Sequence, residues 1–216
     1  LGAPALMYLA SAGVGRITVI DPDTVDLTNL QRQIVHTTAR IGQPKVASAQ
    51  AGLAQLNPEV QVQAIAQAAD AKLLAHWVPQ ADVVLDCTDH FAIRHLINRA
   101  CQQARVPLVS ASAVRFDGQI SVFDPRLPDA PCYACLFPPD QPPPETRCAT
   151  LGIFAPLVGM LGVMQAGEAL KLLARLDGNH TPLAGRLMML DARDWHWTEL
   201  RARRDAACPV CGPEQD

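Results

Sequence analysis

Apolar runs and amphipathic stretches alternate through the first half of the chain, and the apolar runs are short. Apart from Arg16 and Asp82, which open them, the runs 16–20 and 82–85 consist of β-branched or aliphatic residues, and each run is followed by an aspartate, Asp21 or Asp86. Such runs are typical of buried strands, whereas residues 91–104 have a helical composition. This alternation predicts βαβ units whose strands carry acidic residues to the carboxyl edge of a sheet, where open α/β folds bind ligands.

In the second half of the chain the pattern changes. Residues 113–123 alternate around Asp117-Gly118, a turn signal that predicts a hairpin or a bent antiparallel extension of the sheet. Residues 156–176 are apolar on most faces, which predicts a buried helix and a possible contact with a second subunit. The other elements expected from the pattern are helices at 5–12, 46–56 and 70–78 and strands at 60–65, 107–111, 186–190 and 195–200.

The predicted fold class is therefore α/β, a Rossmann-like mixed sheet with a parallel N-terminal half and an antiparallel C-terminal extension, with residues 1–216 in a single domain. Composition narrows the class of protein. The 216 residues are 49% hydrophobic with a net charge of −3, which indicates a soluble globular protein and argues against nucleic-acid binding. No basic amphipathic helix suits a membrane surface, and the apolar run 151–164 is too short to span a bilayer. No secretory signal is recognisable, so we expect a cytoplasmic protein.

The chain opens on a helical pattern, whereas a βαβ unit begins with a strand, so we expect a further strand upstream of Leu1. Gly2 precedes Asp21 by 19 positions. Rossmann-like units use that spacing between their phosphate-binding glycines and the acidic residue that holds a ribose hydroxyl. A single glycine is equally explained by close packing of a helix on a strand.

The segment after the first strand is rich in groups suited to phosphate oxygens: Thr28, Asn29, Gln31 and Arg32. A polar surface loop would have the same composition. Lys45 follows in the first turn of the helix expected at 46–56. The helix dipole disfavours a cation at that end, and a phosphate bound there would remove the conflict. The alternative for Lys45 is a solvated side chain.

Asp86 and Asp89 follow the strand at 82–85 and are expected at the same sheet edge as Asp21. Asp89 has two explanations. It can cap the helix that begins near Phe91, which is the commonest role of an aspartate at such a position. It can also bind Mg²⁺, which takes one or two carboxylates together with the phosphate oxygens of ATP.

Four of the seven cysteines form two Cys-x-x-Cys pairs, Cys132/Cys135 and Cys208/Cys211. Two such pairs supply the four thiolates of a tetrahedral zinc site, a structural zinc knuckle that would tie the second pair, at 208–211, back to the middle of the chain. A redox dithiol is the alternative.

Residues 132–148 run from the first pair into a proline-rich segment that predicts a long mobile loop. Cys148 ends this loop beside Arg147, whose charge would favour an exposed, reactive thiolate. An inert loop cysteine explains the position equally well.

Together these residues resemble the ThiF/MoeB/HesA family, the bacterial relatives of ubiquitin-activating enzymes, over essentially the whole chain. The resemblance is carried by Leu1-Gly2, Ser11-Ala12-Gly13-Val14-Gly15, Asp21 with Thr28-Asn29-Leu30-Gln31-Arg32-Gln33, Gln43-Pro44-Lys45, Asp86-Cys87-Thr88-Asp89, Gly118-Gln119 and both Cys-x-x-Cys pairs. The combination is highly specific, although no single motif is.

The resemblance implies ATP-dependent adenylation of the C-terminal glycine of a ubiquitin-like sulfur carrier in molybdopterin or thiamine biosynthesis. It implies that Asp21 holds the ribose and that Asp89 places Mg²⁺. It also implies phosphate binding by Asn29, Arg32 and Lys45. Further nucleotide contacts would come from Gly2, Thr28, Leu30, Gln31 and His90, with Arg32, Lys45 and Asp89 as the catalytic set. The implied cofactors are ATP, Mg²⁺ and Zn²⁺.

The implied partners are a MoaD- or ThiS-like carrier, a second copy of the chain in a homodimer, and a sulfurtransferase or cysteine desulfurase. Gln43-Pro44-Lys45-Val46 looks more like the MoeB branch, and Ser110-Ala111-Ser112-Ala113-Val114 more like the ThiF branch. In ThiF-like enzymes a cysteine matching Cys148 is implicated in thiol handover. His90 departs from the asparagine that is usual in the family. Most of the glycine-rich loop and an upstream arginine of the family are also absent from this sequence.

Two other readings of these residues compete. A nucleotide-binding oxidoreductase could use the same kind of sheet, but it would need a full dinucleotide crevice, whereas the phosphate-binding groups here favour a triphosphate. A non-catalytic scaffold that binds the carrier and is held together by zinc is the second alternative.

Overall fold

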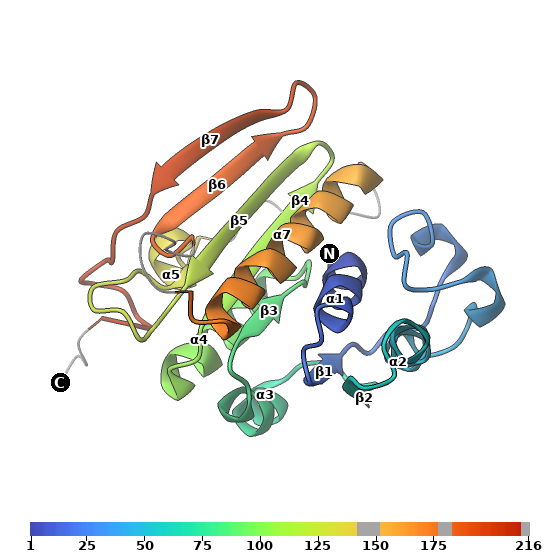
Figure 1. Ribbon diagram of the computed structural model, residues 1–216. Helices are drawn as coiled ribbons and strands as arrows, with labels where there is room; N and C mark the ends of the chain where they lie inside the picture. The colour runs from blue at the N-terminus through green and yellow to red at the C-terminus, as the bar shows by residue number, and fades with distance from the viewer. Residues whose placement is uncertain (142–151, 177–182, 213–216) are drawn as a thin grey trace.

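The computed structural model describes residues 1–141, 152–176 and 183–212. Helices α1, α2, α3, α4, α5 and α7 cover Gly2–Ser11, Lys45–Leu56, Ala71–Trp77, Phe91–Ala104, Tyr133–Leu136 and Ala155–Leu173 (Figure 1). Strands β1 to β7 cover Arg16–Ile20, Gln61–Ile65, Val84–Asp86, Leu108–Val114, Asp117–Phe123, Arg186–Asp191 and His196–Arg201. Short 3-10 helices η1, η2 and η3 cover Leu27–Asn29, Thr38–Arg40 and Val78–Gln80.

The strands form a parallel part and an antiparallel part, as the sequence predicts. β1 and β2 pair in parallel with Arg16 opposite Gln61, and β3 and β4 pair in parallel with Val84 opposite Leu108. From β4 onward the order β4-β5-β6-β7 is antiparallel throughout. The predicted α/β class with a mixed sheet is therefore confirmed.

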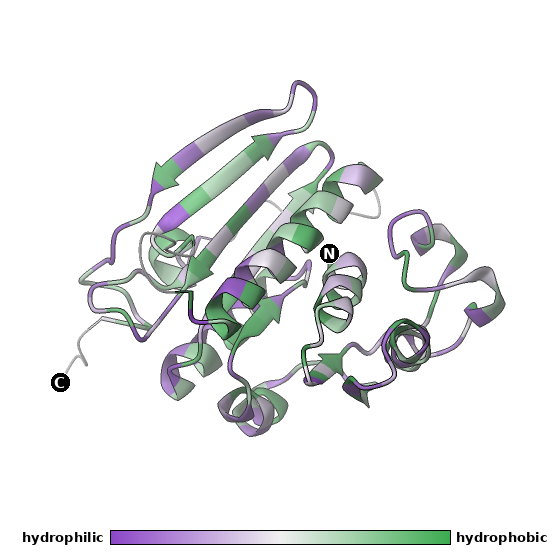
Figure 2. Ribbon diagram, viewed as in Figure 1, coloured by the Kyte–Doolittle hydropathy of each residue, from purple (hydrophilic) through white to green (hydrophobic). Residues whose placement is uncertain are grey.

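Helices cover both faces of the larger sheet because its central strands alternate apolar residues toward both sides. Val109 and Ile120 belong to the cluster that packs against α7, whereas Leu108 and Phe123 belong to the cluster with α3 and α4. Hydrophobic residues accordingly dominate β3 and α7 (Figure 2). The strands are thus held between two apolar layers, and their ends are left for polar groups.

The predicted hairpin exists, but its turn lies earlier than Asp117-Gly118. Asp117 already pairs with Val114, so the chain reverses at Arg115 and Phe116, where Arg115 has a φ of 53°. Gly118 is needed inside β5 for a packing reason, because a Cβ atom there would lie 2.7 Å from Leu161 Cδ1 of α7. The glycine that suggested a turn instead allows a close contact between β5 and α7.

A gap separates the two sheets. Within the described ranges, β1 pairs only with β2 and β3 pairs only with β4, so the other edges of β1 and β3 have no strand beside them. Ile17 and Val19 of β1 nevertheless share one apolar cluster with Val83 and Leu85. A cavity of about 1860 Å³ runs along both strands and is lined also by residues that follow their carboxyl ends.

Cys148 and the later part of the proline-rich segment lie outside the described residues. Among the helices that are described, none has both the length and the apolar composition needed to cross a membrane.

Candidate active site and cysteine cluster

Asp21 stands where β1 ends. Its backbone N–H continues the pairing with β2 by donating to the Ile65 carbonyl at 3.2 Å, and its side chain accepts from the Asp23 N–H at 2.9 Å. Burial raises the pKa of the Asp21 carboxyl, and the bond from Asp23 opposes that shift. The Asp21 carboxylate is thus held at the sheet edge, and the residue lines the cavity.

Lys45 is brought to the same place by pairing between two loops. Its backbone N–H donates to the Asp23 carbonyl at 2.9 Å, and Thr24 bridges to Pro44 beside it. The Lys45 ammonium lies 2.6 Å from Asp23 Oδ2, with the lysine side chain 12% exposed and the aspartate 64% exposed. The predicted position in the first turn of α2 is confirmed, and the cation there is balanced by Asp23.

The loop at 26–33 is held by its own side chains. Asp26 caps η1 by accepting from the N–H and the hydroxyl of Thr28. Asn29 donates to the Thr28 hydroxyl at 3.1 Å and accepts from Gln33 at 3.0 Å, while Arg32 reaches the Thr28 carbonyl at 3.3 Å. Thr28 therefore serves as the centre of this loop, and Asn29 and Arg32 project from it.

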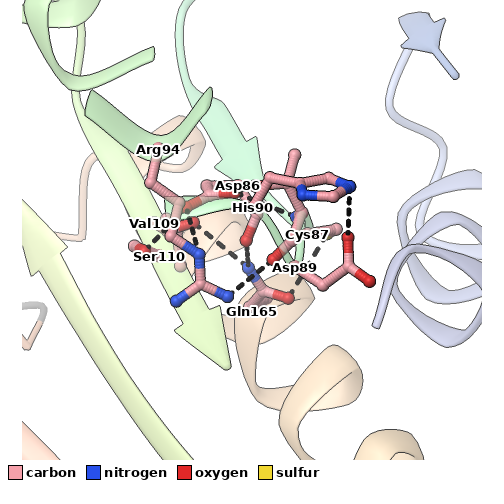
Figure 3. A network of polar contacts seen from close by, with 9 residues as sticks. Asp86, Cys87, Asp89, His90, Arg94, Val109, Ser110 and Gln165 are labelled. Carbon is pink, nitrogen blue, oxygen red and sulfur yellow. Dashed lines mark hydrogen bonds and ion pairs between the residues drawn. The ribbon is translucent and has the colours of Figure 1, made fainter. Parts of the chain in front are cut away.

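The turn after β3 is organised by a buried carboxylate (Figure 3). Asp86, 1% exposed, accepts from the backbone N–H and hydroxyl of Thr88 and from the Ser110 hydroxyl at 3.0 Å. Arg94 lies with its Nε 3.9 Å from Asp86 Oδ2 and donates through Nη2 to the Thr88 carbonyl at 2.6 Å. The residues that follow β3 are thereby held in one conformation.

Gln165 of α7 joins this network from the opposite side (Figure 3). Its amide nitrogen donates to the carbonyls of Asp86 and Val109 at 2.8 and 3.1 Å, and its oxygen accepts from the Cys87 thiol at 3.4 Å. Burial raises the pKa of Cys87 to about 11, so this cysteine is a neutral donor. By solvent exposure Cys87 is half-buried, and it also lines the cavity.

Asp89 and His90 turn outward from that network. Asp89 Oδ1 lies 3.6 Å from His90 Nε2, and the two side chains are 65% and 80% exposed. The capping explanation for Asp89 is wrong, because the N-cap of α4 is His90 and no side chain caps this helix. The Asp89 carboxylate is therefore free to meet a ligand.

The cavity collects most of the predicted nucleotide-contacting residues. Its lining includes Gly2, Asp21, Asn29, Arg32, Lys45, Asp89 and His90. Thr28, Leu30 and Gln31 are absent from that lining and belong to the supporting loop. The carboxylates of Asp21 and Asp89 and the cations of Arg32 and Lys45 thus open into one space that extends past the ends of β1 and β3.

The second predicted site also assembles. The four Sγ atoms of Cys132, Cys135, Cys208 and Cys211 lie within 4.8 Å of one another. Neighbouring sulfurs are separated by 3.4 to 3.9 Å. A tetrahedron with Zn–S bonds of about 2.3 Å has edges of about 3.8 Å, so the four thiols match a zinc ion in size and in donor type.

The cysteine cluster also has unequal proton affinities. The hydrogen bond between Cys132 and Cys135 lowers the pKa of Cys135 to about 5, and the same bond together with burial raises the pKa of Cys132. One thiolate is therefore favoured, and the remaining thiols would ionise on binding a divalent cation.

A family model described as the ThiF family matches residues 1–210. The chain belongs to the ThiF family. The match includes the cavity residues, the first Cys-x-x-Cys pair and Cys208 of the second pair, so the resemblance seen in the sequence is confirmed.

Curated relatives cover almost all of the chain. It is 48% identical over 212 residues to the sulfur carrier protein ThiS adenylyltransferase of Escherichia coli, covering 98% of this chain and 82% of the relative. It is 44% identical over 215 residues to the molybdopterin-synthase adenylyltransferase of the same organism, covering 98% and 83%. A crystal structure of E. coli MccB with ATP superposes on this chain with a TM-score of 0.81 at 25% sequence identity. The superposition covers 98% of this chain and 63% of the MccB chain.

Three polar residues of the cavity were not singled out from the sequence as ligand groups. Asp23 pairs with Lys45 across 22 positions, and His36 Nδ1 lies 2.9 Å from the Ser48 hydroxyl. Burial, with Lys45 and Arg40 nearby, lowers the pKa of His36. Arg94 lines the cavity from α4. Only Asp23 carried a signal, since it stands in the acidic run after β1.

Proposed function

We propose that this chain adenylates the C-terminal glycine of a ubiquitin-like sulfur carrier at the expense of ATP. The observation that carries the proposal is the single cavity into which Asp21, Asn29, Arg32, Lys45 and Asp89 open. Membership of the ThiF family and the names of the two E. coli relatives, both adenylyltransferases, support the same reaction.

In the proposed reaction the carrier's terminal carboxylate oxygen attacks the α-phosphorus of ATP. The bond from that phosphorus to its bridging oxygen breaks, and pyrophosphate leaves with the electron pair, so the carrier is left as an acyl-adenylate. No side chain of the enzyme acts as nucleophile. Arg32 and Lys45 would hold the phosphates and neutralise their charge, and Asp21 would hold the ribose, so that catalysis comes from positioning and electrostatics.

Asp89 fits a role in placing Mg²⁺. Its carboxylate is largely exposed at the cavity and has only His90 beside it, at 3.6 Å, so its oxygens are available to a cation. When bound with ATP, Mg²⁺ supplies further neutralisation of phosphate charge. His90 would adjust the position of Asp89 from the neighbouring residue.

We further propose that the cysteine cluster holds a structural Zn²⁺. Four thiolates complete the tetrahedron and leave no open position, so the ion would contribute to folding and take no part in adenylation. Reduced thiols are required, which suits the cytoplasm.

The proposed assembly is a homodimer of a single adenylyltransferase domain over 1–216 that binds a MoaD- or ThiS-like carrier and receives sulfur from a sulfurtransferase or a cysteine desulfurase. Cys148, in the 132–148 segment, remains a candidate for thiol transfer. The two E. coli relatives differ little in identity, 48% and 44%, so both carriers belong in the test.

The test is carrier-dependent exchange of labelled pyrophosphate into ATP. The purified protein is assayed with a ThiS-like carrier and with a MoaD-like carrier, and each is compared with a form that lacks its C-terminal glycine. Exchange should appear only with an intact carrier. Carrier binding without ATP binding would favour the scaffold, and hydride transfer to NAD without exchange would favour an oxidoreductase.

A further inference from the structure

Asn98 is a fully buried amide in the middle of α4, a helix whose N-terminal end borders the cavity. A buried amide must satisfy both ends of its side chain. The Asn98 oxygen accepts from the backbone N–H of Tyr133 at 3.0 Å. That bond fixes the orientation of the amide, since only the oxygen can accept.

The other end of the Asn98 amide is aimed at the cysteine cluster. Its Nδ2 lies 3.5 Å from the Sγ of Cys132, a distance suited to an N–H···S hydrogen bond. Cys132 is 0% exposed, so solvent does not compete for that sulfur. Cys135 differs, because its sulfur accepts a backbone N–H, from Asp205, at 3.5 Å.

Four thiolates around Zn²⁺ carry a net charge of −2. Cys132 and Cys208 are the two buried members of the cluster, and Cys132 is the less exposed of the two. A buried anion is costly unless donors surround it. An N–H bond to the sulfur stabilises the thiolate and holds it in the direction of the metal, as outer-shell groups do for other ligands.

We propose that Asn98 is a positioning residue of the zinc site, which holds the Cys132 thiolate and slows loss of the metal. The proposal rests on the proposed zinc site and is independent of adenylation. Helix α4 then has two roles. Its first residues line the cavity, and Asn98, seven residues after Phe91, supports the zinc ligand Cys132.

The chain offers a matched control for this inference. Asn57 uses its amide in the same way, with Nδ2 donating to the Ala10 carbonyl at 2.9 Å and Oδ1 accepting from the Glu59 N–H at 3.1 Å. None of its partners is a cysteine. Asn57→Asp therefore makes the same chemical change as Asn98→Asp at a site without a sulfur acceptor.

The experiment measures zinc release from the purified full chain to a chromogenic chelator, with no ATP or carrier present. Asn98→Asp keeps the acceptor for Tyr133 and replaces the donor to Cys132, so zinc should leave on the order of 10 to 100 times faster than from the wild type. Asn57→Asp should release zinc at the wild-type rate. Cobalt-substituted Asn98→Asp should also show a shifted sulfur-to-metal charge-transfer band, which a merely destabilised fold would not produce.

Should Asn98→Asp fail to fold, Asn98→Ala removes the donor without adding charge, and faster release with the same spectral shift is expected. Equal release from the wild type and both Asn98 variants would overturn the proposal. So would a wild-type protein that holds no zinc. Neither result depends on whether the protein adenylates a carrier, so a failure here is distinguishable from a failure of the proposed reaction.

Discussion

Asp86 and Asp89 are aspartates three positions apart, and they have different roles because their surroundings differ. Asp86 is 1% exposed, accepts hydrogen bonds from Thr88 and Ser110, and lies 3.9 Å from the guanidinium of Arg94. Asp89 is 65% exposed on its side chain and has no hydrogen-bond donor of that kind within the described residues. The buried carboxylate shapes the turn, and the exposed one is the group proposed to place Mg²⁺.

We therefore predict that Asp89→Ala abolishes adenylation, with a loss on the order of 10²-fold or more, because a carboxylate that places a cation on the phosphates is removed. Zinc content should stay unchanged, since the cysteine cluster is untouched. Pyrophosphate exchange and metal analysis on the same preparation test this. Glu59→Ala, which removes an exposed acid outside the cavity, is the control, and exchange at the wild-type rate by the Asp89 variant would refute the assignment.

The Lys45–Asp23 ion pair gives a second prediction at this scale. Phosphate should replace Asp23 as the partner of the lysine, so Asp23→Asn should retain MgATP binding and change the free energy of unfolding by less than about 1 kcal/mol. Lys45→Met should weaken MgATP binding about tenfold or more, since a hydrogen bond to a charged group contributes about 1.5–3 kcal/mol. Calorimetric titration separates the two variants. Equal losses would mean that the ion pair itself, and not the lysine, forms the site.

At the scale of elements, the sequence predicted what depends on local pattern. β1 and α4 occupy the expected residues, and Asp70 caps α3 by accepting from Leu73 N–H at 2.7 Å. The predicted turn at Asp117-Gly118 was wrong because Gly118 is required for close packing against α7, some forty residues later in the chain. A contact between residues so far apart in the sequence cannot be predicted from the pattern of a short segment.

In the candidate site, too, features set by local sequence pattern could be predicted, and features set by contacts distant in the sequence could not. Positions at strand ends and helix starts, such as Asp21 and Lys45, could be predicted because local pattern sets them. The partner of Lys45 could not, since the two loops that join it to Asp23 are paired by tertiary contacts. Asn98 was missed for the same reason, because its sulfur partner is 34 positions away.

Glycines of α7 provide a prediction about how elements pack. A Cβ atom on Gly162 would lie 2.5 Å from Pro4 Cγ and press on the Leu1 carbonyl, so Gly162→Ala should lower the free energy of unfolding by about 1–3 kcal/mol. Gly159 has no atom within 4 Å of such a Cβ, so Gly159→Ala should raise it by about 0.5–1 kcal/mol. Denaturant unfolding of both variants measures the difference. Equal effects would mean that α1 does not pack closely on α7 in solution.

At the scale of the whole molecule, two sheets share one apolar cluster, and no strand pairing joins them among the residues that the structure describes. Helices α1 and α7 lie side by side across the interval between β1 and β3 (Figure 1). Side chains of β1 and β3 pack against α1 and α7, so the two sheets are joined by apolar packing. Residues of both β1 and β3 line the cavity, and within the described ranges the facing edges of these two strands pair with no other strand.

This arrangement predicts uneven hydrogen exchange in the chain of residues 1–216. β5 is paired on both sides, with β4 and β6, so its amides should be among the best protected. The amides of β1 and β3 that point into the interval should exchange on the order of 10²-fold faster or more, because local opening exposes them without breaking a strand pair. Residue-resolved exchange measures this, with the β1 amides that bond to β2 as the internal control. Protection of the facing edges equal to that of β5 would show instead that another strand covers them in solution.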